Sequence, residues 1–516
     1  MSEAIAHPAR RPRPLRIPAA VAGALALTLM APVPAAAGAG TDWIRIRTDA
    51  AHRLFAHMPV ARRHAVSSVS APTLPVTNCD DDGAGSLRAT VAAAADGDTI
   101  DLAGLACSTI TLTTGAIEID LDNLAFQGPG RDSLVLDGNA LGRVFIHPYG
   151  GTLTLRGMTV RNGRDRATGF HVAGGGCIAS GGYLELVDVT MRDCYAGGEG
   201  AYGGALYAYS LVLSNSTLSG NVANGVHEDA GTAAFGGAAF VYRMQLIDST
   251  VSGNRAEHHV RPGRPSYDIA GGIVAVSGGR ISGSTIDSNL SQGRAGGIAV
   301  FNSLEVSNST ISGNTAESDI AGGLFLRSPS ALSLHNSTVT ANHSALDGGG
   351  VWLDAPGSDF RSSIVSGNST DVGNRDNRYA SAIAFNVDGG NNLVGSTSPT
   401  VTLPADGLTD NPRLGPLARN GGPNRTHALL DDSPAIDAGS NDDGLAFDQR
   451  GPGFVRDYGS APDIGAFEFQ PIVTASAAPV PSLSRWGLAM LAMLLGAFAA
   501  CGKPLHRNGL RSGRSA

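Results

Sequence analysis

Polar side chains that could bind or cleave a ligand gather in long segments between positions 164 and 268. Carboxylates, imidazoles and guanidinium groups occur there together, the set required for glycoside hydrolysis by two carboxylates or for β-elimination with an arginine base. Polar insertions are also ordinary protein surface, so the pattern predicts a ligand face without identifying a catalytic group. The candidate residues are Arg164, Asp165, His171, Glu199, His227, Glu228, Asp229, His258, His259, Arg261, Arg264, Tyr267 and Asp268.

Other chemical patterns are weaker. His258 and His259 could ligate a metal, but adjacent histidines on a polar segment are more often simply exposed. The acidic run 80–82 before Gly83 lacks the rest of a twelve-residue calcium loop and is more typical of a turn. Aspartate pairs at 431–432 and 442–443 lie far from the polar segments, and the sequence contains no Gly-His-Gly. We therefore predict no metal, no cofactor and no recognisable catalytic motif.

Charge excludes further classes of function. Lys503 is the only lysine, so Schiff-base and P-loop chemistry are excluded from residues 1–502. The chain has a net charge of -8, but residues 38–480 hold 28 basic and 44 acidic residues, a net charge near -16. That balance argues against nucleic acid or another polyanion as a partner, unless a local arginine patch reverses the field.

A repeated line dominates the middle of the chain. It reads Asn-Ser-Thr-Leu-Ser-Gly-Asn at 215–221 and returns in related form at 248–254, 283–289, 308–314 and 336–342, with degenerate copies on both sides. Equivalent positions are 25 to 35 residues apart, and a glycine pair followed by alternating apolar residues lies between successive copies. These segments are too short for helices, and the period is too short for propeller blades of about 40 residues.

Stacking such units buries one continuous core, with each strand paired to its equivalent about 4.8 Å along the stack. The pattern resembles the right-handed parallel β-helix of pectate-lyase-like and autotransporter-like proteins, so we predict an all-β solenoid over 109–400. The asparagine that ends each line should stack on its neighbours as an amide ladder. The ladder residues are Asn221, Asn254, Asn289, Asn314, Asn342 and Asn368.

Two flanking segments resemble the ends of such solenoids. Residues 76–108 look like an N-terminal cap, with a short amphipathic helix from Ser86 to Ala95 closing the core. Residues 401–470 hold Asn-Pro-Arg-Leu-Gly-Pro-Leu at 411–417, Ser-Pro-Ala-Ile-Asp-Ala-Gly at 433–439 and Asp-Ile-Gly-Ala-Phe-Glu at 463–468. These blocks resemble the choice-of-anchor domain found beside surface-sorting tails, which implies a C-terminal cap and no particular activity.

The chain contains five cysteines, and Cys501 lies in its C-terminal tail. The remaining four, Cys79, Cys107, Cys177 and Cys194, allow three disulfide connectivities, of which the local one joins each residue to its neighbour in sequence. Free thiols are less expected in an exported chain, and the spacing is not that of a zinc site.

Both ends of the chain read as export signals. Residues 1–37 have an arginine-rich start, an apolar run and a small-residue cleavage site, as in a secretory signal; residues 38–75 form a lead segment of unknown role. After a linker at 471–479, residues 480–516 combine a short motif, an apolar run and a basic end. The motif residues are Val480, Pro481, Leu483, Ser484, Trp486 and Gly487.

That tail resembles the IPTL-type sorting signal of Gram-negative bacteria, with Val480 and Ser482 as mild departures. The resemblance implies a transmembrane helix, an exosortase-type enzyme as partner, and transfer to the cell surface, the outer membrane or the medium. We therefore predict an exported, surface-sorted β-helix protein of structural, adhesive or glycan-binding type. The alternative is a polysaccharide lyase or glycoside hydrolase whose site lies on the long-loop face.

Overall fold

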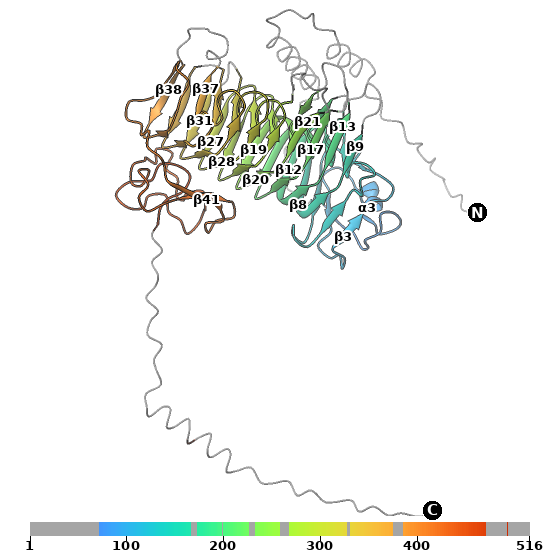
Figure 1. Cartoon of the computed structure of the whole chain (residues 1–516). Helices are drawn as coiled ribbons and strands as arrows, with labels where there is room; N and C mark the ends of the chain where they lie inside the picture. The colour runs from blue at the N-terminus through green and yellow to red at the C-terminus, as the bar shows by residue number, and fades with distance from the viewer. Residues whose placement is uncertain are drawn as a thin grey trace, which may run out of the picture. The chain divides into compact units, whose positions relative to one another are not determined.

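A computed structural model describes residues 72–166, 173–198, 200–225, 233–258, 268–327, 331–354, 356–374 and 385–470, together with Met493. Parallel strands stack coil upon coil along one axis, so the described part of the chain is a parallel β-helix, as predicted (Figure 1). The export signal at 1–37 and nearly all of the sorting tail lie outside the described residues. Within the described residues, no helix is long and apolar enough to cross a membrane.

Each wall of the solenoid is a column of hydrogen-bonded parallel strands. The first column is β4 (Ile117–Glu118), β7 (Phe145–His147), β11 (Ile178–Ser180), β15 (Leu206–Ser214), β19 (Ala239–Ile247), β22 (Ile273–Ala275), β26 (Ile298–Val300), β30 (Leu324–Leu326), β34 (Val351–Leu353) and β37 (Val372–Asn374). The second, which shares β15 and β19, adds β1 (Thr73–Pro75), β2 (Thr99–Asp101), β5 (Leu124–Gln127), β8 (Thr152–Arg161), β12 (Tyr183–Arg192), β23 (Gly279–Ser282), β27 (Leu304–Ser307), β31 (Leu332–His335), β35 (Ser358–Arg361), β38 (Phe385–Gly390) and β40 (Val401–Thr402).

Two further walls complete the coils. The third column shares β8 and β12 and adds β3 (Thr109–Thr111), β6 (Val135–Asp137), β16 (Thr217–Ser219), β20 (Thr250–Ser252), β24 (Thr285–Asp287), β28 (Thr310–Ser312), β32 (Thr338–Thr340), β36 (Ile364–Val365) and β39 (Leu393–Val394). The fourth is β9 (Arg164–Arg166), β13 (Tyr195–Gly198), β17 (Val222–Gly225), β21 (Arg255–His258), β25 (Leu290–Ser291), β29 (Thr315–Ala316) and β33 (His343–Ser344). A short sheet follows it, made of β10 (Ala173–Gly174), β14 (Ala201–Tyr202) and β18 (Ala234–Phe235).

Alternation along each strand fills the interior. In β15 and β16, Leu211, Leu213 and Leu218 are fully buried in the main core, whereas the alternating strand residues Val212, Thr217 and Ser219 are partly exposed. A left-handed residue precedes each Ser-Thr pair, for example Asn215 with φ of 48°. Asparagine, aspartate and glycine tolerate that conformation best, which explains why they recur at this position.

Two hydrogen-bonded ladders run along the interior of the repeat. The side-chain amide of Asn221 donates to Asn254 Oδ1 at 2.9 Å, and the same bond repeats at 2.8 to 2.9 Å through Asn289, Asn314, Asn342 and Asn368. A second ladder, which the sequence analysis did not identify, joins backbone N–H groups to serine hydroxyls of the next coil. Its serines are Ser216, Ser249, Ser284, Ser309, Ser337 and Ser363.

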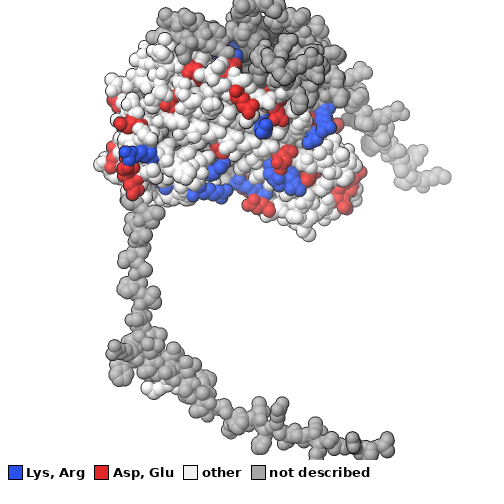
Figure 2. Space-filling view, viewed as in Figure 1, with Lys and Arg blue, Asp and Glu red and all other residues white. Residues whose placement is uncertain are grey.

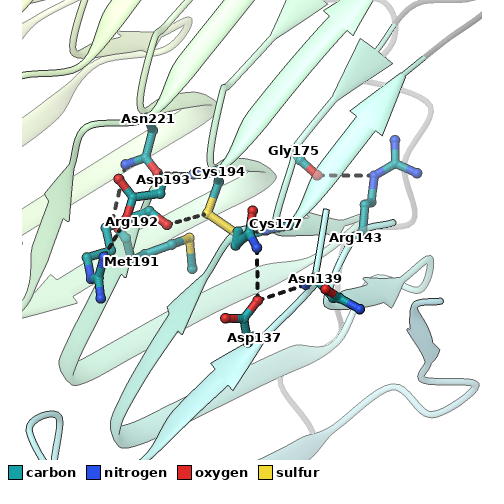
Figure 3. Close-up of a disulfide and its surroundings, with 12 residues drawn as sticks. Asp137, Asn139, Arg143, Gly175, Cys177, Met191, Arg192, Asp193, Cys194 and Asn221 are labelled. Carbon is teal, nitrogen blue, oxygen red and sulfur yellow. Dashed lines mark hydrogen bonds and ion pairs between the residues drawn. A yellow bond between two sulfur atoms is a disulfide. The ribbon is translucent and has the colours of Figure 1, made fainter. Parts of the chain in front are cut away.

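The asparagine ladder has a distinct partner at each end. At one end, the Asp371 carboxylate accepts both the backbone N–H and the side-chain amide of Asn368, at 2.9 and 2.8 Å. At the other end, Cys194 occupies the ladder position and its N–H donates to Asn221 Oδ1 at 3.0 Å. Cys194 forms a disulfide with Cys177 (Figure 3), whose sulfur accepts the N–H of Gly163 at 3.2 Å. The asparagine ladder therefore ends at the Cys177–Cys194 disulfide.

The N-terminal end is covered by α3 (Leu87–Ala93), close to the predicted helix. Ser86 caps it by accepting the Ala89 N–H, and Leu87 and Val91 are buried against the core. The Asp81 carboxylate accepts bonds from the N–H groups and hydroxyls of two threonines at 113–114 and pairs with Arg88. The acidic run thus ties the cap to the first coils.

Cys79 and Cys107 form the second disulfide, so both disulfides follow the local connectivity, in which each cysteine is joined to its neighbour in sequence.

Residues 412–470 lie along the side of the solenoid, whereas the sequence predicted that residues 401–470 form a cap. This segment contains β41 (Leu414–Ala418) and β42 (Thr426–Leu429), which pair antiparallel. Its polar groups bond to threonines that recur on the third column: Thr250, Thr285, Thr310 and Thr338. Because these threonines lie on four successive coils, the segment joins coils that would otherwise contact only their neighbours.

A buried charged cluster holds this segment together. Arg450 pairs with Asp448 at 2.6 Å and lies between the rings of Phe454 and Phe467, with its guanidinium carbon 3.8 Å from each centroid. The buried Arg456, Asp463 and Glu468 lie beside this pair.

We expect this cluster to make stability depend on pH. Three carboxylates face two guanidinium groups, and burial raises the pKa of Glu468 to about 8. In the unfolded chain Glu468 ionises near its ordinary pKa of 4.5, so unfolding releases a proton between the two values. Stability should therefore fall as pH rises from about 5 to 8, lowering Tm by roughly 5 °C, as thermal unfolding across that range would measure.

The control is Glu468→Gln. Both carboxylate oxygens accept backbone N–H groups, of Tyr458 and Asp463, so an amide would place a donor against a donor. Glu468→Gln should lower Tm at every pH yet flatten its pH dependence. An unchanged slope would show that another group titrates.

Candidate functional site

Four of the thirteen predicted ligand residues fall among the described residues: Arg164, Asp165, His258 and Asp268. The other nine lie outside them: His171, Glu199, His227, Glu228, Asp229, His259, Arg261, Arg264 and Tyr267. The four described residues stand where long segments leave or rejoin the coils, beside the fourth column and the short sheet that follows it.

Asp165 has a structural role. Its carboxylate binds the Arg143 guanidinium and accepts the Gly174 N–H at 2.8 Å, which joins β9 to β10. Arg143 also donates to the carbonyls of Gly174 and Gly175, both at 3.1 Å. Burial lowers the pKa of Arg143, and the charge of Asp165 opposes that shift. An ion pair engaged in this way positions backbone and leaves this carboxylate poorly placed to act as a base.

His258 and Asp268 are also buried. Their side chains are 2% and 0% exposed, and Nδ1 of His258 lies 2.5 Å from Asp268 Oδ2. The other oxygen of Asp268 accepts the Ala234 N–H, and Gln292 accepts the N–H of His258. This pair joins the two ends of the segment 259–267 and adjacent coils. Within the described ranges, no group of three His, Cys, Asp or Glu residues could hold a metal.

A different surface carries partly exposed aromatic rings, two of which, Tyr209 and Tyr242, also pack against a second buried apolar cluster. Tyr209 and Tyr242 stack with centroids 5.1 Å apart and planes 14° apart, and Tyr183 packs edge-on against Tyr209 at 5.8 Å. Tyr183 is 36% exposed and the other two are half-buried. We call these three residues the tyrosine strip. They stand on successive coils, so the strip runs along the solenoid axis.

A hollow of about 550 Å³ opens beside the strip. Its lining includes Arg243, Gln245, Arg280, Asn302 and two glycines at 278–279, and we call it the 243–280 hollow. A Cβ on Gly279 would lie 2.5 Å from Cγ of Met244, so a larger residue there would disturb the packing of the core.

The side chains that line the 243–280 hollow are mostly hydrogen-bonding groups. Arg243 lies 6.0 Å from the ring of Tyr242, and Arg280 pairs with Glu305 at 2.7 Å on the exposed surface. Guanidinium and amide groups donate to hydroxyl or carboxylate oxygens, and tyrosine rings pack against apolar faces of a ligand. The described residues that line the hollow include no carboxylate, so it lacks the pair that glycoside hydrolysis requires.

The alternation of residues 206–210 is a sequence signal for this surface, which the predicted ligand face did not include. In Leu206-Tyr-Ala-Tyr-Ser210 the tyrosines alternate with buried residues, so both point away from the main core, where they pack against a second apolar cluster. Over the face drawn in Figure 2, most of the surface is uncharged and basic and acidic side chains are interspersed. Charge alone therefore does not mark a site on that face.

Comparison with known families adds evidence about the C-terminus. The model described as "IPTL-CTERM motif" matches residues 478–508, which include the predicted motif from Val480 to Gly487. The chain carries an IPTL-CTERM sorting signal. Such a signal implies export and sorting to the surface, and the two disulfides fit an oxidising compartment.

Other comparisons are less informative. No curated protein matches the sequence significantly. The crystal structure of pectate lyase Pel9A aligns over 78% of this chain and 98% of its own, with 14% identity and a TM-score of 0.34. Similarity at that level supports no statement about activity. The similarity of residues 401–470 to choice-of-anchor domains stays a prediction.

Proposed function

We propose that this chain is a cell-surface adhesive protein that binds glycan in the 243–280 hollow and against the tyrosine strip. The observation that carries the proposal is the pairing of partly exposed tyrosines on successive coils with an open hollow lined by arginine and amide side chains. Such a surface suits a saccharide, whose apolar ring faces pack on aromatic rings while its oxygens accept hydrogen bonds.

Binding should depend on both arginines. We expect Arg243→Ala combined with Arg280→Ala to lower affinity for any glycan that binds the full chain by at least about tenfold, because charge-assisted hydrogen bonds are lost. A glycan array followed by calorimetry would measure this. Arg192→Ala is the matched control, since Arg192 lies on β12 outside the hollow and pairs with Asp193. Equal losses of affinity in the double arginine variant and in Arg192→Ala would contradict the assignment of the glycan site to the 243–280 hollow.

The same incubations distinguish the enzyme alternative. Binding without cleavage supports an adhesin, whereas new reducing ends indicate a hydrolase and new unsaturated ends a lyase. If no glycan binds, the solenoid is structural and the proposed site is wrong.

We further propose that an exosortase-type enzyme processes the tail at the inner membrane and that the body then reaches the outer membrane or the medium. The support is the matched sorting signal at 478–508. Deleting residues 480–516 should leave the chain away from the surface, as fractionation and surface labelling of cells would measure. The chain with Cys501→Ala, a change within the apolar run, is the control and should sort normally. If the deleted and full chains reach one location, the tail is not a sorting signal.

A further inference from the structure

A second hollow, of about 350 Å³, opens near the N-terminal end of the solenoid. Its lining includes three arginines, Arg143, Arg164 and Arg166, and two large apolar residues, Leu141 and Ile146. We call it the 141–166 hollow. It is separate from the 243–280 hollow, since the two have no lining residue in common.

The lining of the 141–166 hollow carries more positive than negative charge. Asp165 neutralises Arg143, as described above, and is the only carboxylate among the described lining residues. Arg164 lies 4.9 Å from the ring of Tyr195, an uncharged partner. Among the described residues, no carboxylate pairs with Arg164 or Arg166. Two positive charges therefore face one small hollow in a body whose net charge is near -16, which is the local arginine patch that could reverse the field.

The apolar residues of the lining stand on an ordered stretch of backbone. Leu141 is 61% exposed, the most exposed of the large apolar side chains that the structure describes between 72 and 470. It is fixed by a turn in which Asn139 and Ala140 both have positive φ, of 54° and 55°. The Ala140 N–H bonds to Asn162 O at 2.8 Å and the Leu141 N–H to Gly138 O at 3.1 Å. A non-glycine residue in this conformation stores strain, and here the turn presents an apolar side chain to solvent.

We propose that the 141–166 hollow binds a molecule in which a carboxylate or sulfate group lies next to an apolar group. The oxyanion would accept hydrogen bonds from Arg164 and Arg166, and the apolar group would pack on Leu141 and Ile146. Arginine suits this role because its planar group offers two parallel donors to an oxyanion. The volume admits a small ligand or one end of a larger one. This site is additional to the proposed glycan surface and does not depend on it.

The test compares three probes on the full chain: hexanoate, which has both features, hexan-1-ol, which lacks the charge, and acetate, which lacks the apolar chain. Calorimetry should give a saturable site for hexanoate, with affinity at least about tenfold higher than for either other probe. Replacing acetate by methyl sulfate and hexanoate by hexyl sulfate shows which oxyanion the site prefers.

Variants then locate the site. Arg164→Gln combined with Arg166→Gln should reduce hexanoate affinity at least about tenfold with only a small change in Tm, since neither arginine has an ion pair to lose and Arg164 loses only its contact with the Tyr195 ring. Leu141→Ser should reduce hexanoate affinity and leave acetate binding unchanged. Arg280→Gln, in the other hollow, is the control and should have no effect. The proposal is overturned if hexanoate does not saturate, if hexan-1-ol binds equally well, or if a correctly folded double variant keeps full affinity.

Discussion

Asn289→Ala should lower the free energy of unfolding by about 4 kcal/mol, more than any surface substitution. Asn289 is 1% exposed and makes four ladder bonds through its side chain. Its amide donates to Asn314 Oδ1 and Val251 O, both at 2.9 Å, and its oxygen accepts the N–H and the amide of Asn254 at 3.0 and 2.9 Å. Alanine would leave several of these buried groups without a partner, which costs more than the bonds themselves contributed.

The effect should extend beyond one coil. Each amide both donates and accepts, so the bonds polarise one another in one direction toward the Asp371 carboxylate. Interrupting the chain at Asn289 should weaken both halves, and hydrogen exchange should speed up at Asn254 and Asn314 as well as at the substituted coil. Denaturant unfolding measures the total loss.

The matched control is Asn386→Ala. Asn386 also lies in a strand of the solenoid, β38, but its side chain is exposed. We expect its replacement to change the free energy of unfolding by less than about 0.5 kcal/mol. Similar losses for the two variants would mean that asparagine stabilises these strands through the backbone and not through the ladder.

Periodicity explains why this much of the fold could be predicted from one sequence. Every coil repeats the same contacts, so Asn221 and Asn342 meet equivalent surroundings, and one line of sequence reports on all of them. The cap helix was predictable for a local reason, because Ser86 followed by an amphipathic segment is a start signal contained within a few residues.

The candidate site was less predictable because its contacts are not periodic. Nothing near Asp165 in sequence indicated that Arg143, from the preceding coil, neutralises it. Likewise, His258 looked exposed beside His259, yet its ring is buried against Asp268. Polar residues in insertions take their roles from partners on other coils, and the repeat pattern does not encode those partners.

The lateral position of residues 412–470 could not be read from sequence for a related reason. The threonines that receive this segment are part of the repeat, so they look identical whether they face solvent or another segment. Only the partners, such as Asn424 for Thr250 and Gln449 for Thr310, distinguish the covered coils. Those partners are themselves ordinary polar residues in a region without periodicity.

Removing the Cys177–Cys194 disulfide should have the second large effect on stability. Cys177→Ala combined with Cys194→Ala should lower the free energy of unfolding by about 3 kcal/mol, since the bridge closes a loop with a sequence separation of 17. The loss also removes the sulfur that accepts the Gly163 N–H in the buried interior. Denaturant unfolding under oxidising conditions would measure it.

A second double variant distinguishes the stability lost with loop closure from the stability lost at the end of the asparagine ladder. Cys194 occupies a ladder position, and its N–H already donates to Asn221 Oδ1 (Figure 3). Cys177→Ala combined with Cys194→Asn would place an amide there, with space vacated by the sulfur of Cys177. By the register of β12 with β8, this amide faces Val160 O as the Asn221 amide faces Met191 O. It should recover about 1 kcal/mol of the loss. If the asparagine variant is no more stable than the double alanine variant, the ladder ends at Asn221 for a reason other than the disulfide, and the bridge acts through loop closure alone.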